Sequence, residues 1–207
     1  MKKCAVLTML VLALSAAWAI EGTALIGANS QTWDDGSGNS GTGGGAHFGI
    51  LGSIGMTPSC LPVYLGVETG FLTQSAKYNW ETGFGELDVN LKYNNLVIPI
   101  LLKGTFKPTG KIHIGAGLGP SLIIHSSGVM GIGIDDWSLM GDIDDDDLKT
   151  EIGFQIKGDV GIKLIPLLWL KPGITLQINS NPYSPVTGQK EGSETTWFIH
   201  IGLAIKP

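Results

Sequence analysis

The sequence predicts an all-β fold, namely an eight-stranded antiparallel up-and-down transmembrane β-barrel. Three observations lead to this fold class. Apolar and polar residues alternate with a period of two along most of the chain, whereas helical spacing is hard to find. Many of the alternating segments reach roughly the 9–11 residues that a tilted strand needs to cross a bilayer. Short and long connections also alternate along the chain, as they do in transmembrane barrels.

The N-terminal residues have the composition of an export signal. Two lysines give a positive start, residues 4–17 are apolar, and residues 17–19 match an A-x-A cleavage site. The apolar stretch is too short to span a membrane. We therefore expect residues 1–19 to be a signal peptide and residues 20–207 to form one outer-membrane β-barrel domain.

The expected mature chain is acidic and contains no arginine. Without Lys2 and Lys3, 11 of the 13 lysines remain against 18 acidic residues, which gives a formal charge of −7. This balance argues against nucleic acid as a partner, because nucleic-acid binding needs a basic surface. Cys60 has no second cysteine in the mature chain, so neither a disulfide framework nor a cysteine metal site is expected.

Eight strands are expected in chain order. Short connections should follow the second, fourth and sixth strands, and long loops should follow the others on the extracellular side. The glycine- and serine-rich segment 29–45 is expected to be a flexible loop. The strands are expected at 22–28, 46–55, 62–75, 84–106, 111–125, 150–164, 168–179 and 194–205, and the other long loops at 76–83, 126–149 and 180–193.

Several residues fit regular strands poorly. Pro99, Pro120 and Pro172 lie inside expected strands, where each removes a ladder hydrogen bond, so bulges or local breaks are expected. Asn94 and Asn95 interrupt an unusually long strand, and they mark either a bulge or a turn.

Charged residues occupy the polar faces at mid-strand, Lys171 among them. A soluble β-sandwich would turn such a face to water, whereas a membrane barrel encloses it in the lumen and turns the apolar face to lipid. Because unpaired charge in a low-dielectric interior is costly, we expect carboxylates and lysines to pair there. The expected structural charge network of the lumen consists of Glu68, Lys92, Lys103, Lys157, Asp159 and Lys163.

The glycine-rich segment 111–126, KIHIGAGLGPSLIIHS, has a superficial likeness to a dinucleotide-binding loop. That fingerprint needs a third glycine where Pro120 stands, and it needs a helix to follow, whereas here a strand follows. The glycines at 115, 117 and 119 should instead face the lumen and make room for lysines and carboxylates of neighbouring strands. His113 and His200 fall on the same face as filling, and no cofactor is expected.

Other chemical interpretations are weaker. The acidic run 142–147 lacks the glycine and glutamate of an EF-hand, so a solvated loop with adventitious cation binding is the alternative to a built site. His125, Ser126 and Ser127 precede Asp135 and Asp136, but a barrel rim ordinarily collects such residues, so we expect no enzyme. Interfacial girdles could include the aromatic residues near strand ends, Trp169, Trp197, Phe84 and Phe106.

The segment LVIPILLKGTF at 96–106 resembles the L-x-I-P-L-L-L-K-Y signature of small outer-membrane β-barrel proteins of the PorT-like family. A short turn and the glycine-rich strand follow it, and GFQIKGDVGIKL at 153–164 is similar to the next strand of that family. The resemblance covers residues 46–205. It implies an eight-stranded barrel of the OmpA/OmpX architecture and no single activity.

We therefore expect a protein of the cell outer membrane with a structural or envelope-integrity role, or a surface-contact role like that of an adhesin. The expected partners are the outer-membrane bilayer, the assembly machinery of that membrane and an extracellular ligand of the loops 29–45, 126–149 and 180–193. A narrow channel is one alternative. A soluble exported barrel that binds a small apolar ligand is the other, and its apolar residues would face inward.

Overall fold

The computed structural model describes most of the chain from Ile20 to Lys206. The expected signal peptide 1–19, Cys60 and Phe84 lie outside the described residues. Among the residues described, no helix combines the length and apolarity required to cross a membrane. The described ranges are 20–34, 40–56, 62–81, 87–134, 137–142, 150–180, 182 and 192–206, and the description omits the side chains of 76–81, 87–93, 126–134 and 137–142.

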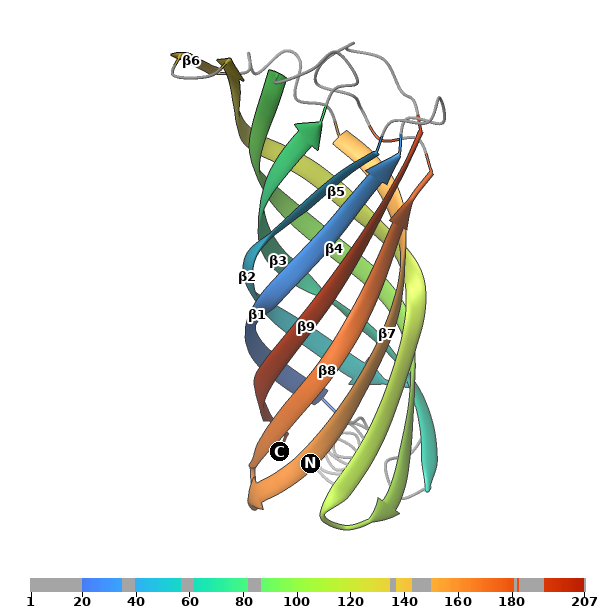
Figure 1. Ribbon diagram of the computed structural model, residues 1–207. Coiled ribbons are helices and arrows are strands. Elements are labelled where there is room, and N and C mark those ends of the chain that lie inside the picture. Colours follow the sequence, from blue (N-terminus) through green and yellow to red (C-terminus); the bar gives the residue numbers. More distant parts are fainter. Residues whose placement is uncertain are drawn as a thin grey trace, which may run out of the picture.

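Nine antiparallel strands form one sheet, and eight of them close into a barrel (Figure 1). Each barrel strand pairs with its neighbour along the chain, β5 pairs with β7, and β9 pairs with β1 to complete the ring. This architecture confirms the predicted fold class. The strands are β1 (Ile20–Asp34), β2 (Ser40–Gly55), β3 (Val63–Glu81), β4 (Leu87–Thr109), β5 (Ile112–Ile134), β6 (Trp137–Asp142), β7 (Thr150–Ile165), β8 (Leu168–Asn179) and β9 (Ser193–Ile205).

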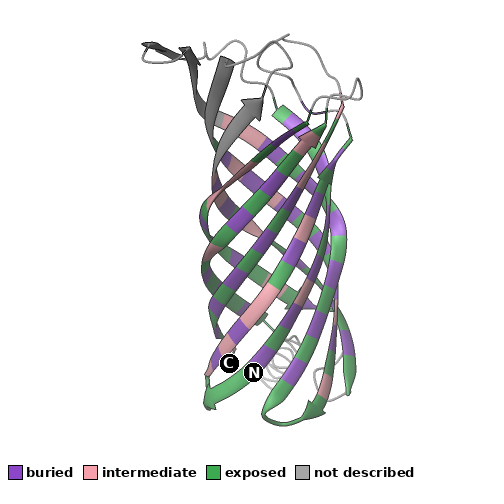
Figure 2. Ribbon diagram, viewed as in Figure 1, coloured by how far each residue is buried: buried purple, intermediate pink, exposed green. Residues whose placement is uncertain are grey.

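Burial alternates residue by residue along the barrel strands (Figure 2). In β9 the side chains of Phe198 and His200 are buried, whereas Trp197, Ile199 and Ile201 are exposed. The same period of two is visible in the sequence, because successive side chains of a strand point to opposite faces of the sheet. The apolar face is therefore outside, and the polar face encloses the lumen.

The two ends of the barrel differ. The connection from Met56 to Pro62 and the turns at 110–111 and 166–167 lie at one end, together with Ile20 and Lys206 (Figure 1). We call this the terminal end and the opposite one the loop end. The three short connections are where the sequence predicts them.

Two expected loops contain regular structure. β1 and β2 pair without interruption from Ile20↔Ile54 to Asp34↔Ser40, so the expected loop 29–45 is wrong over most of its length. Backbone ladder bonds require no side chain, which is why a glycine-rich segment continues the hairpin. The expected loop 126–149 contains the end of β5 and all of β6, which pairs with β5. Most of the expected loop 180–193 lies outside the described residues.

The interruptions in the strands are smaller than expected. The β4–β5 register shifts by one residue between Asn94 and Asn95, so this dipeptide forms a bulge within a continuous strand. The pairings Pro99↔Ser121 and Leu102↔Leu118 keep one register, and so do the pairings on both sides of Pro172. The prolines therefore interrupt the ladder locally and cause no register shift, contrary to the bulges expected there.

Candidate functional site

Seven charged side chains meet inside the terminal half of the lumen, and we call them the lumen charge cluster. They come from five barrel strands and the residue that follows β9, so the cluster crosses the interior from wall to wall. Its carboxylates are Glu21, Glu68 and Asp159, and its lysines are Lys103, Lys157, Lys171 and Lys206.

Glu68 of β3 is the most deeply buried acid of the cluster, with 1% of its surface exposed. Its Oε2 accepts a hydrogen bond from Lys103 Nζ at 2.6 Å, and its Oε1 accepts one from Lys157 Nζ at 2.5 Å. β3, β4 and β7 supply these three residues, so one carboxylate joins distant parts of the wall. Charge-assisted bonds of this kind are stronger than neutral ones.

Glu21 and Asp159 extend the cluster toward the terminal end. Lys171 Nζ lies 2.5 Å from Glu21 Oε1 and 3.3 Å from Asp159 Oδ1, while Lys103 Nζ lies 3.5 Å from an oxygen of each. Lys206 Nζ is 3.7 Å from Glu21 and donates to the Tyr64 hydroxyl at 2.6 Å. The three acids face an equal number of deeply buried lysines, and Lys206 lies nearer the opening.

The structure brings together four of the six residues expected in the charge network: Glu68, Lys103, Lys157 and Asp159. Lys163 is a correction: it lies outside the cluster, exposed at the end of β7, 5.8 Å above the Trp169 ring. The position of Lys163 so near the strand end takes it out of the enclosed lumen. Lys92 lies in β4, but its side chain is outside the part of the chain that the structure describes.

Sequence reasoning omitted Glu21, Lys171 and Lys206 from the network. Lys171 stands on the polar face that was recognised, and it needed only to be counted. Glu21 was missed because the first strand was expected to begin at residue 22, whereas β1 begins at Ile20. The alternation of Glu21, Thr23 and Leu25 with outward residues was the signal that could have found it.

A tightly packed layer lies above the charge cluster. Gln155 of β7 donates to Gln177 of β8 at 2.8 Å, and the His47 ring lies edge-on to Phe198 with centroids 5.0 Å apart. One cavity of about 10 Å³ borders His47 and Lys157, which is room for about one water molecule. The buried apolar side chains of this layer include Leu25, Leu51, Leu72, Val97 and Ile123.

A second polar group lies near the loop end. His125 Nδ1 is 2.8 Å from Asn95 Oδ1, and His125 Nε2 is 3.2 Å from a carboxylate oxygen of Glu151. The Asn179 amide also donates to Glu151. In the described residues no three His, Cys, Asp or Glu side chains are grouped so as to hold a metal ion.

The alternatives placed at the rim concern residues beyond this description. The side chains of Ser126 and Ser127 lie outside the described part, as do Asp135 and Asp136. The acidic run 142–147 also falls outside it, except for the backbone of Asp142. The Ser/His/Asp site and the cation site therefore stay alternatives.

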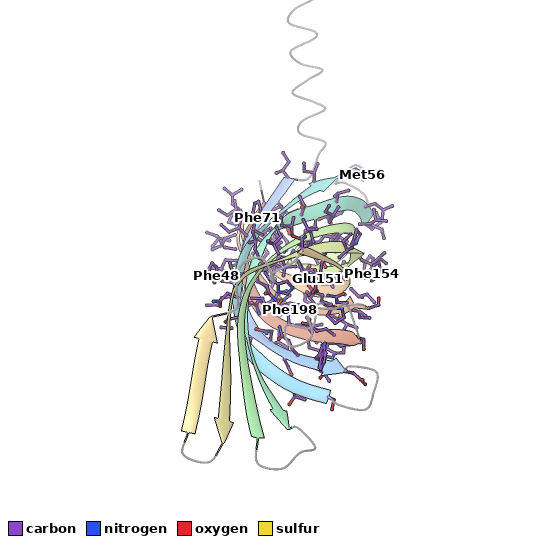
Figure 3. The ribbon with its side chains drawn as sticks, turned by 90° about the horizontal axis from the view of Figure 1, so that it is seen from above. Phe48, Met56, Phe71, Glu151, Phe154 and Phe198 are labelled. Atoms are coloured by element: carbon purple, nitrogen blue, oxygen red, sulfur yellow. The ribbon has the colours of Figure 1, made fainter. Side chains whose placement is uncertain are left out.

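The outer face of the barrel is apolar on all eight strands of the ring. Figure 3 shows Phe48, Phe71 and Phe154 at the periphery, with Phe198 and Glu151 inside. A soluble monomer rarely exposes an apolar patch of more than a few hundred Å², and here the patch encircles the molecule above a charged interior. The chain is a membrane-spanning β-barrel.

The aromatic residues near the strand ends divide between the two faces. Trp197 and Phe106 are exposed on the outer face, where a girdle requires them. Trp169 is a correction, because it is buried in the lumen and stacks on His113 with ring centroids 4.2 Å apart.

No protein-family model and no curated protein matches this sequence. Among solved structures, the chain is similar to the outer membrane protease OmpT from Escherichia coli, with a TM-score of 0.46, 8% identity, and coverage of 91% of this chain and 97% of that one. A major outer membrane protein from Thermus thermophilus gives 0.43, 13%, 92% and 100%. Ail, the attachment invasion locus protein of Yersinia pestis, gives 0.41, 10%, 89% and 98%. At these identities the fold is argued from the strands and burial of this chain itself.

Proposed function

We propose that this chain is a non-enzymatic protein of the cell outer membrane, with a closed barrel that anchors a contact surface on the outer side. The terminal end would face the periplasm, because an exported chain enters the membrane from that side. Its role would be structural or adhesive and would depend on the loop end. The assembly machinery of the outer membrane would be its folding partner.

The lumen charge cluster is the observation that carries this proposal. A pore for ions needs a continuous aqueous path, but here Glu68, Lys103 and Lys157 span the interior at hydrogen-bond distances. The packed layer above them adds a second obstruction. An eight-stranded barrel has an interior just wide enough for side chains to fill, so the obstruction leaves little space for solutes.

The form of the loop end supports a contact role. β4 and β5 stay paired as far as Leu87↔Ile134, whereas β7 begins at Thr150, opposite Ile124. The end of β5 therefore continues beyond β7, and β6 pairs with it there (Figure 1). A sheet that projects past the barrel wall offers backbone and side chains to an external partner.

The alternative of a soluble barrel with an apolar interior is not supported, because charged side chains occupy the interior and apolar ones the exterior. The channel alternative is tested by single-channel recording of the purified barrel in a planar bilayer. We expect no conductance steps from the wild type. A triple variant, Glu68→Ala, Lys103→Ala and Lys157→Ala, should conduct if it folds, since it removes the obstruction. Regular conductance steps from the wild type would contradict a closed barrel.

The contact role needs a separate experiment. Replacing residues 128–141 by a two-residue Asn-Gly turn removes the projecting hairpin and leaves the barrel pairings β4–β5 up to Ser127 and β5–β7 in place. Cells that display the shortened protein should lose attachment to a target surface, or should gain sensitivity to detergent, while the barrel stays folded. Unchanged attachment and unchanged detergent resistance would contradict a role for this end.

A further inference from the structure

Charge is distributed unevenly between the two ends of the barrel. Outside the lumen charge cluster, every acidic residue of the mature chain lies in the loop-end segments 34–35, 81–88, 135–151 and 191–194. The terminal-end segments 56–62, 107–111, 163–167 and 205–207 contain four lysines and no acidic residue. The terminal end is therefore basic at its rim.

Two of these lysines are direct neighbours across the β5–β7 ladder. The backbone amide of Lys163 donates to the carbonyl of Lys111 at 2.9 Å, next to the pair Ile112↔Ile162. Both lysines are exposed. Like charges at opposed cross-strand positions are destabilising, and no ion pair to a described carboxylate relieves this one.

The lysine pair lies at the lower edge of the apolar exterior. Ile112 and Ile162, which flank it toward the barrel centre, are each 40% exposed on the lipid-facing side. Leu164 and Leu167 continue this apolar face, with 51% and 55% of their surfaces exposed. A lysine at such a boundary can lay its methylene stem on apolar surface and hold its ammonium group at the level of lipid headgroups.

A third lysine lies on the neighbouring strand. Lys107 follows the outward-facing Phe106 at the end of β4, and its Nζ lies 4.5 Å from the centre of the Tyr64 ring. Lys107, Lys111 and Lys163 thus come from the ends of three consecutive barrel strands. They form an arc on one side of the rim.

We propose that the Lys111–Lys163 pair, with Lys107 beside it, binds the phosphate of an anionic phospholipid in the periplasmic leaflet. Lysine binds phosphate as a compact point charge. A phosphate between two ammonium groups converts their repulsion into attraction, and the acyl chains of the same lipid cover Ile112, Ile162 and Leu164. This inference rests on the membrane embedding of the proposed function.

The test is native mass spectrometry of the folded barrel after reconstitution in an equal mixture of phosphatidylglycerol and phosphatidylethanolamine. The wild type should retain phosphatidylglycerol in preference. The double variant Lys111→Gln/Lys163→Gln should lose that preference by about fivefold for each lysine, from the worth of a basic residue near an anionic surface. The matched control is Lys149→Gln/Lys190→Gln, which removes the same charge from the loop end.

The outcomes separate the possibilities. Equal phosphatidylglycerol retention by the wild type and the double variant would overturn the proposal. Displacement of the lipid by millimolar glycerol phosphate would also overturn it, because the rim would then be a site for soluble phosphate. An unboiled, fast-migrating band on SDS gels shows that each variant is still a folded barrel, so loss of lipid preference alone leaves the embedding intact. Absence of that band in the wild type would instead reject the embedding.

Discussion

Gly115 of β5 is paired directly with Asp159 of β7, and the missing side chain of the glycine is the space that the carboxylate occupies. A Cβ at Gly115 would lie 2.6 Å from Asp159 Oδ1. The same carboxylate lies within 3.5 Å of Lys103 and 3.3 Å of Lys171. A glycine on the inner face is thus part of the arrangement that admits the lumen charge cluster.

Gly115→Val should destabilise the barrel by about 2 kcal/mol, because the added side chain displaces Asp159 from its lysines in a filled interior. Urea unfolding in lipid vesicles, followed by tryptophan fluorescence, measures this. Gly110→Ala is the matched control, since nothing lies within 4 Å of a Cβ at that turn residue. Equal stability of the two variants would show that the space at Gly115 is unimportant.

Glu68→Gln should be more damaging than the loss of one ion pair suggests. The substitution leaves Lys103 and Lys157 facing each other in the lumen without their shared carboxylate, and removal of one partner from a buried pair costs roughly 3–5 kcal/mol. Combining Glu68→Gln with Lys157→Met should restore part of the stability. Strictly additive losses in this double-mutant cycle would argue against a coupled cluster.

The period of two was sufficient to predict the fold, because burial depends on which face a side chain occupies. It placed Glu68 and Asp159 inside and Ile199 and Ile201 outside, as the structure has them. It could not tell how far along a strand the enclosed lumen extends. For that reason Lys163 was expected in the lumen and lies at the rim, while Glu21 was overlooked.

Segment 29–45 shows a different limit of the sequence. Its glycines and serines predict a flexible loop by composition, yet their backbone groups pair from Asp34↔Ser40 onward. Pairing depends on the partner strand, which local composition does not report. The contacts within the charge cluster are likewise tertiary, so the sequence predicts that Asp159 needs a lysine and leaves open which one.

A lysine on the outer face should be costly in proportion to its depth. Ile201 lies midway along the apolar face of β9 and is 56% exposed, whereas Ile205 ends that strand at the rim with 62% exposed. We expect Ile201→Lys to destabilise the folded barrel by roughly 2–4 kcal/mol and Ile205→Lys by roughly 0–1 kcal/mol. Equilibrium folding into vesicles measures both. A soluble barrel would tolerate the two lysines equally.

The orientation of the strands is the central claim, and a spin-label scan along β9 tests it most directly. Single cysteines at positions 197 to 205, in a Cys60→Ser background, would be labelled in reconstituted vesicles, and collision rates with oxygen and with a water-soluble nickel chelate would be measured. We predict high oxygen and low nickel accessibility at Trp197, Ile199, Ile201 and Leu203, alternating with low oxygen accessibility at Phe198, His200 and Gly202. High nickel accessibility at the outward positions, or no period of two, would contradict a lipid-facing apolar wall around a filled lumen.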